Sequence, residues 1–159
     1  MKRIKILKLV ISILVCQVAG LIGSLFTLSS ISTWYAQLEK PTFNPPNWVF
    51  APVWTLLFLL MGISLYLIVS KGVENKKVKT ALSIFVIQLT LNMLWSFLFF
   101  GLQSLLYAFI EIIILGLAIL LTIISFYKIS KTAAYLLLPY VLWVSFAAVL
   151  NFSILILNL

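Results

Sequence analysis

Histidine is absent from this sequence of 159 residues, and the other side chains that carry most enzymatic and metal chemistry are scarce. There is one cysteine, Cys16, and there are three acidic residues, Glu39, Glu74 and Glu111. Without histidine the chain lacks the usual imidazole ligand and general base, and one cysteine cannot form an internal disulfide. Glycine-rich phosphate loops and serine or cysteine triads are also missing. We therefore predict no metal site and no required cofactor.

Charge is scarce as well, with 9% charged residues against 64% hydrophobic ones. Soluble domains have about 25% charged and about 45–50% apolar residues, so this composition indicates a protein of the lipid bilayer. A membrane-spanning helix needs about 20 apolar residues. Five runs are long enough: Ile6–Phe26, Val49–Val69, Val78–Phe100, Leu105–Phe126 and Ala133–Leu157.

These runs predict an all-α integral membrane protein, a bundle of five transmembrane helices that forms a single domain over residues 1–159. The links between the runs are too short for a soluble domain. Basic residues before the first run resemble the start of a signal peptide, but the apolar part of a signal peptide spans only about 7–15 residues. We therefore expect the first run to be a helix of the bundle, with Cys16 as a small buried hydrophobe.

The net charge of +8 is distributed unevenly along the chain. Ten of the eleven basic residues fall on one side of the predicted membrane, and only Lys40 falls on the other. Positive residues gather on the cytoplasmic side, so we predict a cytoplasmic N-terminus, with the first loop and the C-terminus outside. Membrane topology explains the charge, and we predict no nucleic-acid partner. The ten residues are Lys2, Arg3, Lys5, Lys8, Lys71, Lys76, Lys77, Lys79, Lys128 and Lys131.

The stretch KPTFNPPNWVFAPVW, residues 40–54, holds four of the five prolines. Each proline fixes φ and lacks an N–H donor, so Pro41, Pro45 and Pro46 predict a stiff loop that covers the outer end of the bundle as a lid. Pro52 is expected in the first turn of the second helix, where a missing donor costs nothing. The residues expected in the aromatic belt at the membrane surface are Trp34, Tyr35 and Trp48.

Aromatic and amide side chains share one face on each of three predicted helices. The three groups are Trp54, Phe58 and Met61; Gln88, Asn92, Trp95 and Phe99; and Trp143, Ala147, Leu150 and Asn151. Because the second helix enters from the side where the third and fifth leave, these faces meet between the membrane centre and its outer surface. The small Ala147 leaves room beside the Trp143 indole. Such a slot suits a flat, mostly apolar ligand.

The alternative is that these residues form only contacts between helices. Membrane helices commonly use Asn, Gln and Ser for interhelical hydrogen bonds. The spacing of the residues leaves both interpretations open.

Three segments carry a resemblance to a known family. They are WYAQLEKPTFNPPNWVFAPVWTLLFLLMG, NMLWSFLFF and LLPYVLWVSFAAVLN, within residues 34–151. Together they resemble the translocator protein family, also called tryptophan-rich sensory proteins or peripheral benzodiazepine receptors (TspO/MBR). The resemblance implies a five-helix bundle, often a homodimer, with a pocket for porphyrins and benzodiazepine-site ligands. The residues that match the family's pocket are Tyr35, Trp54, Phe58, Asn92, Trp95, Trp143, Ala147 and Leu150.

Some bacterial members are reported to degrade protoporphyrin IX in light, and the resemblance places Trp54 and Trp143 at the positions implicated. Animal members carry a cholesterol-recognition segment after the last helix. This sequence ends at Leu159 without a basic tail, so we expect no C-terminal sterol site. Gly20 and Ser24 form a small-xxx-small pair, which is a weak independent indication of a dimer.

We therefore interpret the chain as a membrane-embedded binder of protoporphyrin IX or heme-like tetrapyrroles that senses or regulates their level. Two alternatives remain: light-dependent oxidative degradation of the bound porphyrin, and transport of porphyrins or other small hydrophobic ligands such as sterols. Transport coupled to protons would need an acid within the membrane, and Glu111 is the one candidate. Because no basic partner accompanies it, we expect Glu111 to be protonated and hydrogen-bonded to Tyr107 or to a neighbouring helix.

The uneven basic charge makes the topology testable by cysteine labelling after replacement of Cys16. A cysteine introduced within Val73–Lys79 should be protected from an impermeant reagent added outside, and one within Thr42–Asn47 should react. The reversed pattern of accessibility would overturn the predicted orientation.

Overall fold

A computed structural model of the protein describes residues 2–159. Every regular element in this range is helical. In chain order the elements are α1 (Lys2–Ser30), α2 (Trp34–Gln37), α3 (Asn47–Val69), α4 (Lys76–Ser96), the π-helical segment η1 (Phe97–Gly101), α5 (Leu105–Tyr127), α6 (Lys131–Tyr135) and α7 (Leu138–Leu157).

Five helical segments are long and apolar enough to span a membrane, which confirms the predicted number of transmembrane helices. Their bounds are Arg3–Ser30, Asn47–Val69, Lys76–Gly101, Leu105–Tyr127 and Lys131–Leu157. Apolar side chains also cover the outside of the bundle, and Leu25 and Leu142 are each more than two-thirds exposed, at 68% and 69%. A soluble monomer rarely exposes large continuous apolar patches, so this surface faces lipid and the chain is an integral membrane protein.

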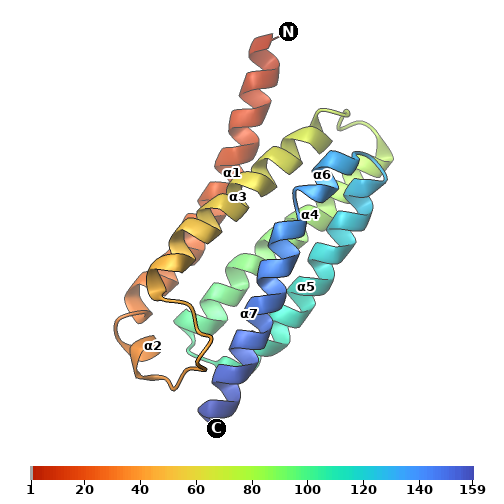
Figure 1. The fold of residues 1–159 in the computed structure, drawn as a ribbon. Coiled ribbons are helices and arrows are strands. Elements are labelled where there is room, and N and C mark those ends of the chain that lie inside the picture. The colour runs from red at the N-terminus through yellow and green to blue at the C-terminus, as the bar shows by residue number, and fades with distance from the viewer. Residues whose placement is uncertain (1) are drawn as a thin grey trace.

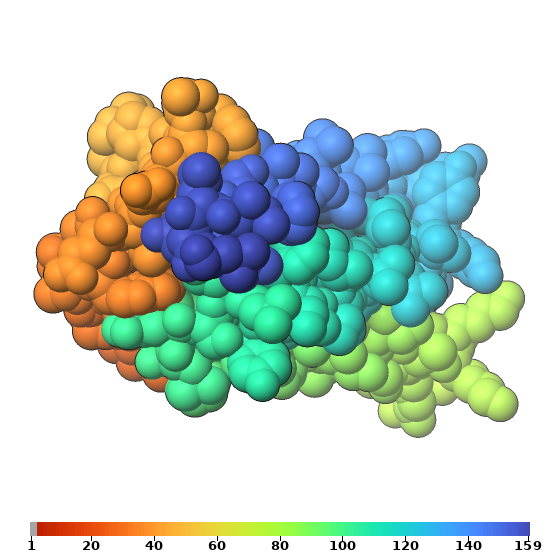
Figure 2. Space-filling view, turned by 90° about the horizontal axis from the view of Figure 1, so that it is seen from below, coloured from red at the N-terminus to blue at the C-terminus, as the bar shows by residue number. Residues whose placement is uncertain are grey.

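The long helices form one bundle in which α1 lies against α3 and α4, and α5 lies between α4 and α7 (Figure 1). The segment from α2 to the start of α3 and the C-terminus lie at the same end, which we call the loop end (Figure 2). Two hydrogen bonds join them: the Glu39 backbone N–H donates to Asn158 Oδ1 at 3.0 Å, and Asn158 Nδ2 donates to the Glu39 carbonyl at 2.9 Å. The α3–α4 and α5–α6 connections lie at the opposite, basic end.

Helices α1 and α3 approach closely in the half of the bundle towards the basic end. A Cβ atom on Gly62 of α3 would lie 2.6 Å from the Ile13 Cα of α1. Only glycine permits this backbone contact, and small residues commonly allow such approaches between membrane helices. Gly62 therefore fixes the separation of α1 and α3.

A closed core fills the basic half of the bundle. Phe85 of α4 stacks on Phe126 of α5, with ring centroids 5.7 Å apart and an interplanar angle of 13°. Ser64 Oγ of α3 donates to the Ala133 carbonyl of α6 at 2.7 Å. All four of these residues are buried, so α3, α4, α5 and α6 are packed tightly together here.

The predicted helices differ from the observed ones in two places. The third run ends in the π-helical segment η1 after Ser96. The fifth run is interrupted at Leu136 and Leu137, between α6 and α7, and Pro139 follows in the first turn of α7. Pro139 lacks the N–H that would bond to the Tyr135 carbonyl in a continuous helix, which accounts for the interruption.

Two local expectations around the first loop are wrong. Pro52 is the sixth residue of α3, because the helix already starts at Asn47, and so Pro52 lies beyond the first turn. Its missing donor leaves the Trp48 carbonyl without the usual helical partner. Tyr35 is only 3% exposed and so is no interfacial belt residue, whereas Trp48 is 74% exposed and fits that role. The lid function of the loop itself stays a prediction.

Candidate functional site

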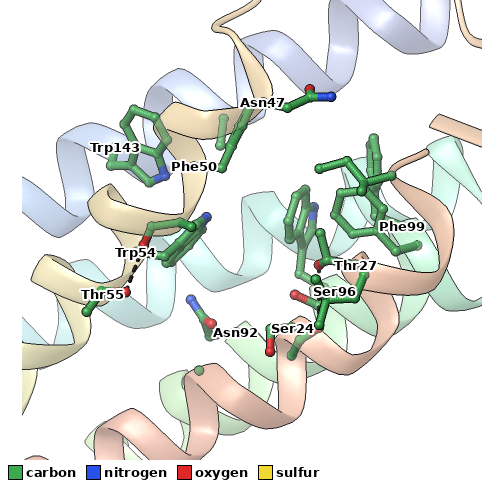
Figure 3. Close-up of a pocket in the computed structure, with 18 of the residues that line it drawn as sticks. Ser24, Thr27, Asn47, Phe50, Trp54, Thr55, Asn92, Ser96, Phe99 and Trp143 are labelled. Atoms are coloured by element: carbon green, nitrogen blue, oxygen red, sulfur yellow. Dashed lines mark hydrogen bonds between the residues drawn. The ribbon is translucent and has the colours of Figure 1, made fainter. Parts of the chain in front are cut away.

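The loop half of the bundle contains a cavity of about 500 Å³, within the range of about 300–1,000 Å³ typical of small-molecule pockets. It is enclosed by α1, α2, α3, α4, η1 and α7. Figure 3 shows Trp54, Phe50 and Trp143 on one side of it and Phe99, Ser96 and Thr27 on the other. We call it the aromatic pocket.

All eight residues predicted to bind ligand line the aromatic pocket. They are Tyr35, Trp54, Phe58, Asn92, Trp95, Trp143, Ala147 and Leu150. They come from α2, α3, α4 and α7, so these parts of the helix faces deduced from spacing do meet in space. Met61 and Gln88, predicted on the same faces, do not line the pocket; they are buried and contact each other, with Gln88 Nε2 3.9 Å from Met61 Sδ. That they bind a ligand stays a prediction.

Indole rings from three helices form the walls, each held by another aromatic side chain. The ring centroids of Trp54 and Phe58 are 5.7 Å apart. Trp95 stacks on Phe99 with ring centroids 5.1 Å apart and an angle of 29° between the rings. Phe50 meets Trp143 edge-on at 6.0 Å and 70°. Edge-to-face and offset pairs at these distances are each favourable by about 0.5–1.5 kcal/mol beyond the area they bury, so the pocket walls are held in place before a ligand arrives.

Aromatic contacts also join α3 and α7 on this side of the bundle. Besides the Phe50 and Trp143 pair, Trp54 meets Tyr140 edge-on at 6.3 Å. Because these contacts are between large rings, α3 and α7 lie further apart than they would with small residues at the same positions. The space between the two helices is part of the aromatic pocket.

Two amide side chains fix the polar framework of the pocket. Asn92 Nδ2 donates to the Tyr140 hydroxyl at 2.8 Å, which links α4 to α7. Asn151 Oδ1 accepts from Trp95 Nε1 at 3.2 Å, and Asn151 Nδ2 donates to the Leu105 carbonyl at 3.1 Å. Buried polar groups need such partners, so these bonds hold the side chains of Asn92 and Trp95 in position.

The indole N–H of Trp143 differs, because it is buried and has no hydrogen-bond partner among residues 2–159. An unpaired buried donor costs about 1–3 kcal/mol. Trp143 lines the aromatic pocket, but this N–H is itself covered, so a bound molecule could pair with it only if the ring or its neighbours moved.

Helix α1 supplies a wall of the pocket that the sequence analysis missed. Gly20, Gly23, Ser24 and Thr27 line it along one face of α1. A Cβ on Gly20 would lie 2.6 Å from the Phe58 ring, so the glycine makes room for that ring. The Gly20 and Ser24 pair thus has a role within the chain, and the homodimer stays a prediction. The signal that could have revealed this wall is the run of small residues at helical spacing.

The pocket opens between α1 and α3 towards the loop end, where its lining residues Leu28, Asn47 and Ala51 are exposed. Further along the same gap, Gln17 Nε2 donates to the Thr55 carbonyl at 3.1 Å and joins the two helices. The opening therefore lies on the loop side of this bond.

Tyr35 of α2 lines the pocket at the loop end. Its hydroxyl donates to Asn44 Oδ1 at 3.0 Å, and Lys40 Nζ lies 4.7 Å from its ring centroid. Burial raises the pKa of the Tyr35 hydroxyl above its ordinary value, and the bond to Asn44 opposes part of the rise. The hydroxyl is therefore neutral and fixes the first loop over Tyr35.

Glu111 of α5 does not line the aromatic pocket. It is 5% exposed, and neither carboxyl oxygen has a hydrogen-bond partner within the described part of the chain. The expected hydrogen bond to Tyr107 or to a neighbouring helix is therefore wrong. Tyr107 is 63% exposed and lies on the outer surface of the bundle.

The chemistry available in the pocket is that of flat rings and a few neutral polar atoms. Its lining contains no Lys, Arg, Asp, Glu or Cys, and no three His, Cys, Asp or Glu side chains gather anywhere in residues 2–159 to hold a metal ion. Such a lining can bind a planar apolar molecule by stacking, but it offers no acid–base pair.

Comparison with known proteins agrees with the resemblance in the sequence. The TspO/MBR family model matches residues 12–157. The tryptophan-rich protein TspO of Archaeoglobus fulgidus is 53% identical over 154 residues, which cover 96% of this chain and 98% of the relative. The protein of the same name from Chlorobaculum tepidum is 46% identical over 154 residues, with 97% and 98% covered. The translocator protein of Sus scrofa is 35% identical over 142 residues, with 89% and 84% covered.

The position of Ala147 in the pocket leads to a first test of ligand binding. Ala147 lines the cavity one turn from Trp143, so Ala147→Phe should fill the slot and weaken binding of protoporphyrin IX at least tenfold. The measurement is a titration in the dark, followed by quenching of tryptophan fluorescence.

Val149→Phe is the matched control, because Val149 lies on the same helix but is 58% exposed to lipid. It adds the same ring outside the pocket and should leave the affinity unchanged. Wild-type affinity in a folded Ala147→Phe variant would place the ligand elsewhere.

Proposed function

The chain belongs to the TspO/MBR family, and we propose that it binds protoporphyrin IX or a related tetrapyrrole in the aromatic pocket and senses or regulates the level of that ligand. A role of membrane sensor or transporter fits the names of its relatives, which include translocator protein and tryptophan-rich sensory protein. The choice of tetrapyrrole rests on the pocket itself.

The convergence of Trp54, Trp95 and Trp143 on one cavity carries this proposal. The rings stand on three helices and line the same space as Phe50, Phe58 and Phe99. A porphyrin is flat, rigid and apolar over most of its surface, so it can stack on several of these rings at once and lose little conformational entropy.

The distribution of charge sets the direction of the bound porphyrin. Protoporphyrin IX carries its carboxylates along one edge, and the aromatic pocket has no cationic lining residue. Burying an unpaired carboxylate is strongly unfavourable. We therefore expect the apolar edge to enter first and the carboxylates to remain at the opening near Asn47, at the loop end.

The closed core favours binding over transport through the bundle. Between the aromatic pocket and the basic end lie Ile68, Phe85 and Phe126, each no more than 1% exposed. A porphyrin could cross this region only if α3, α4 and α5 separated. Glu111, the acid that proton-coupled transport would use, lies outside the pocket lining.

Oxidative degradation is a second candidate, supported by the position of two indoles at the same cavity. Trp54 and Trp143 both line the aromatic pocket. In this scheme light excites the bound porphyrin, oxygen is the oxidant, and one of the two indoles donates an electron. The chemistry needs no acid–base pair, which the pocket does not offer.

The direction of binding gives a test of the proposed function. Uroporphyrin carries carboxylates around its whole edge, so no apolar edge remains to enter a pocket without cations. Protoporphyrin IX should bind at least a hundredfold more tightly, because each buried unpaired polar group costs about 1–3 kcal/mol. Equal affinity for the two porphyrins, measured by fluorescence titration in the dark, would show that the aromatic pocket is not the binding site.

Replacing the two tryptophans separates binding from degradation. Trp54→Phe and Trp143→Phe keep a flat ring, and an aromatic pair is worth about 0.5–1.5 kcal/mol, so affinity for protoporphyrin IX should fall by about tenfold at most. Indole is oxidised much more easily than phenyl, so degradation that uses these side chains should stop. Dark affinity and illuminated product formation are measured on the same preparations at matched occupancy.

Trp48→Phe is the matched control, since Trp48 is 74% exposed and lies outside the pocket lining. This variant should change neither the dark affinity for protoporphyrin IX nor the product formation in light. Degradation at the wild-type rate in both pocket variants would refute an enzymatic role of these indoles. Loss of binding as complete as the loss of turnover would show that the two rings are structural.

A further inference from the structure

A second hollow lies at the basic end, between the first turns of α4 and the last turns of α5. Its lining residues are Asn75, Lys76, Lys77, Thr80, Ala81, Ser125, Lys128 and Ile129. We call it the lysine groove. It lies at the opposite end of the bundle from the aromatic pocket and shares no lining residue with it.

Three lysines, Lys76, Lys77 and Lys128, line this groove, and no acidic residue does. Among the side chains of residues 3–159 the one ion pair joins Lys79 to Glu74 at 3.7 Å, and neither residue lines the groove. Lys131 is also engaged elsewhere, with Nζ 5.6 Å from the Tyr127 ring centroid. The charges of Lys76, Lys77 and Lys128 are therefore without a counter-ion from this part of the chain.

Polar side chains lie beside the three lysines. Thr80 and Ser125 line the groove, one from each helix. The Thr80 hydroxyl already donates to the Lys76 carbonyl at 3.1 Å, so it has no proton left for an anion. The Asn75 side chain already accepts from the Lys77 backbone N–H at 2.9 Å and caps α4. The helix dipole adds partial positive charge at this end of α4, so the groove favours an anion with several oxygen acceptors.

An apolar surface continues from the groove towards the membrane centre. Ile87 lies two turns beyond Thr80 on α4 and is 56% exposed. Leu121 lies one turn before Ser125 on α5 and is also 56% exposed. Residues spaced by three, four or seven positions share a helix face, so an anion in the lysine groove would have lipid-facing surface directly beside it.

We propose that the lysine groove binds the phosphate headgroup of an anionic phospholipid, with the acyl chains lying along the exposed faces of α4 and α5. The lysines of the groove would bind the phosphate of the headgroup, and the adjacent apolar faces would contact the acyl chains, which is why we propose a lipid as the occupant. A free phosphate ion would use only the first of these features. Basic pockets between membrane helices bind anionic headgroups in this way.

The test compares phosphatidylglycerol with phosphatidylcholine on the full-length protein in detergent, by native mass spectrometry at equal lipid concentrations. The wild-type protein should retain more phosphatidylglycerol than phosphatidylcholine. A basic residue near the membrane surface contributes about 1 kcal/mol, so the variant Lys76→Gln, Lys77→Gln, Lys128→Gln should bind phosphatidylglycerol about a hundredfold more weakly. Its binding of phosphatidylcholine should not change.

The matched control is Lys5→Gln, Lys8→Gln, Lys71→Gln, which removes the same charge from exposed positions outside the groove. It should keep the wild-type preference. Equal losses in both variants would show general attraction between basic residues and lipid, and would overturn a specific site. Displacement of the lipid by millimolar inorganic phosphate would also overturn the proposal, since it would mean a phosphate-ion site.

Folding is checked separately by the thermal unfolding midpoint of each variant in phosphatidylcholine alone. Should the triple variant be unstable there, Lys128→Gln alone provides the comparison, with an expected loss of about fivefold. An unchanged phosphatidylglycerol affinity in a stable Lys128→Gln protein would contradict the proposal. Porphyrin binding plays no part in these measurements, so they are independent of the function proposed for the aromatic pocket.

Discussion

Helices in a bilayer gain little by hiding apolar side chains from one another, because lipid is as apolar as the side chains themselves. Close packing and hydrogen bonds must therefore decide where the helices of this protein meet. In the basic half, Gly62 lets the backbones of α1 and α3 touch, and Ser64 bonds to the Ala133 carbonyl of α6. In the loop half, large rings separate α3 from α7. The aromatic pocket lies between these rings and the small residues Gly20, Gly23 and Ser24 of α1.

The polar groups near the pocket follow from the same constraint. A neutral amide can be buried if it finds partners, and Asn92 and Asn151 find theirs on neighbouring helices. A full charge can find none there without a counter-ion, and the pocket lining is accordingly uncharged. The exposed lysines stand instead at the basic end, where water and lipid headgroups can solvate them. The neutral ligand proposed for one end and the anionic headgroup proposed for the other would therefore need no separate domains.

Much of this arrangement could be predicted from the sequence, because the bilayer makes hydropathy and helix length decisive. The five spans and the meeting of Trp54, Trp95 and Trp143 followed from run length and helical spacing. The π-helical segment at residues 97–101 could not be predicted, because its apolar residues would be equally compatible with an α-helix. The wall from α1 was missed because glycine and serine give little signal of their own, and their role appears only when Phe58 is placed against Gly20.

Tyr140 shows how the pocket and the closed core are joined. Its hydroxyl accepts from Asn92 of α4, its ring meets Trp54 of α3 edge-on, and it is itself part of α7. Tyr140 is only 1% exposed, so a movement that broke any of these contacts would leave a cavity in the core. The floor of the pocket is thus tied to three helices, whereas its opening between α1 and α3 is bordered by exposed residues such as Leu28 and Ala51. In the function proposed above, a ligand would enter by movement at this opening while the floor stays fixed, so binding would not require the basic half of the bundle to open.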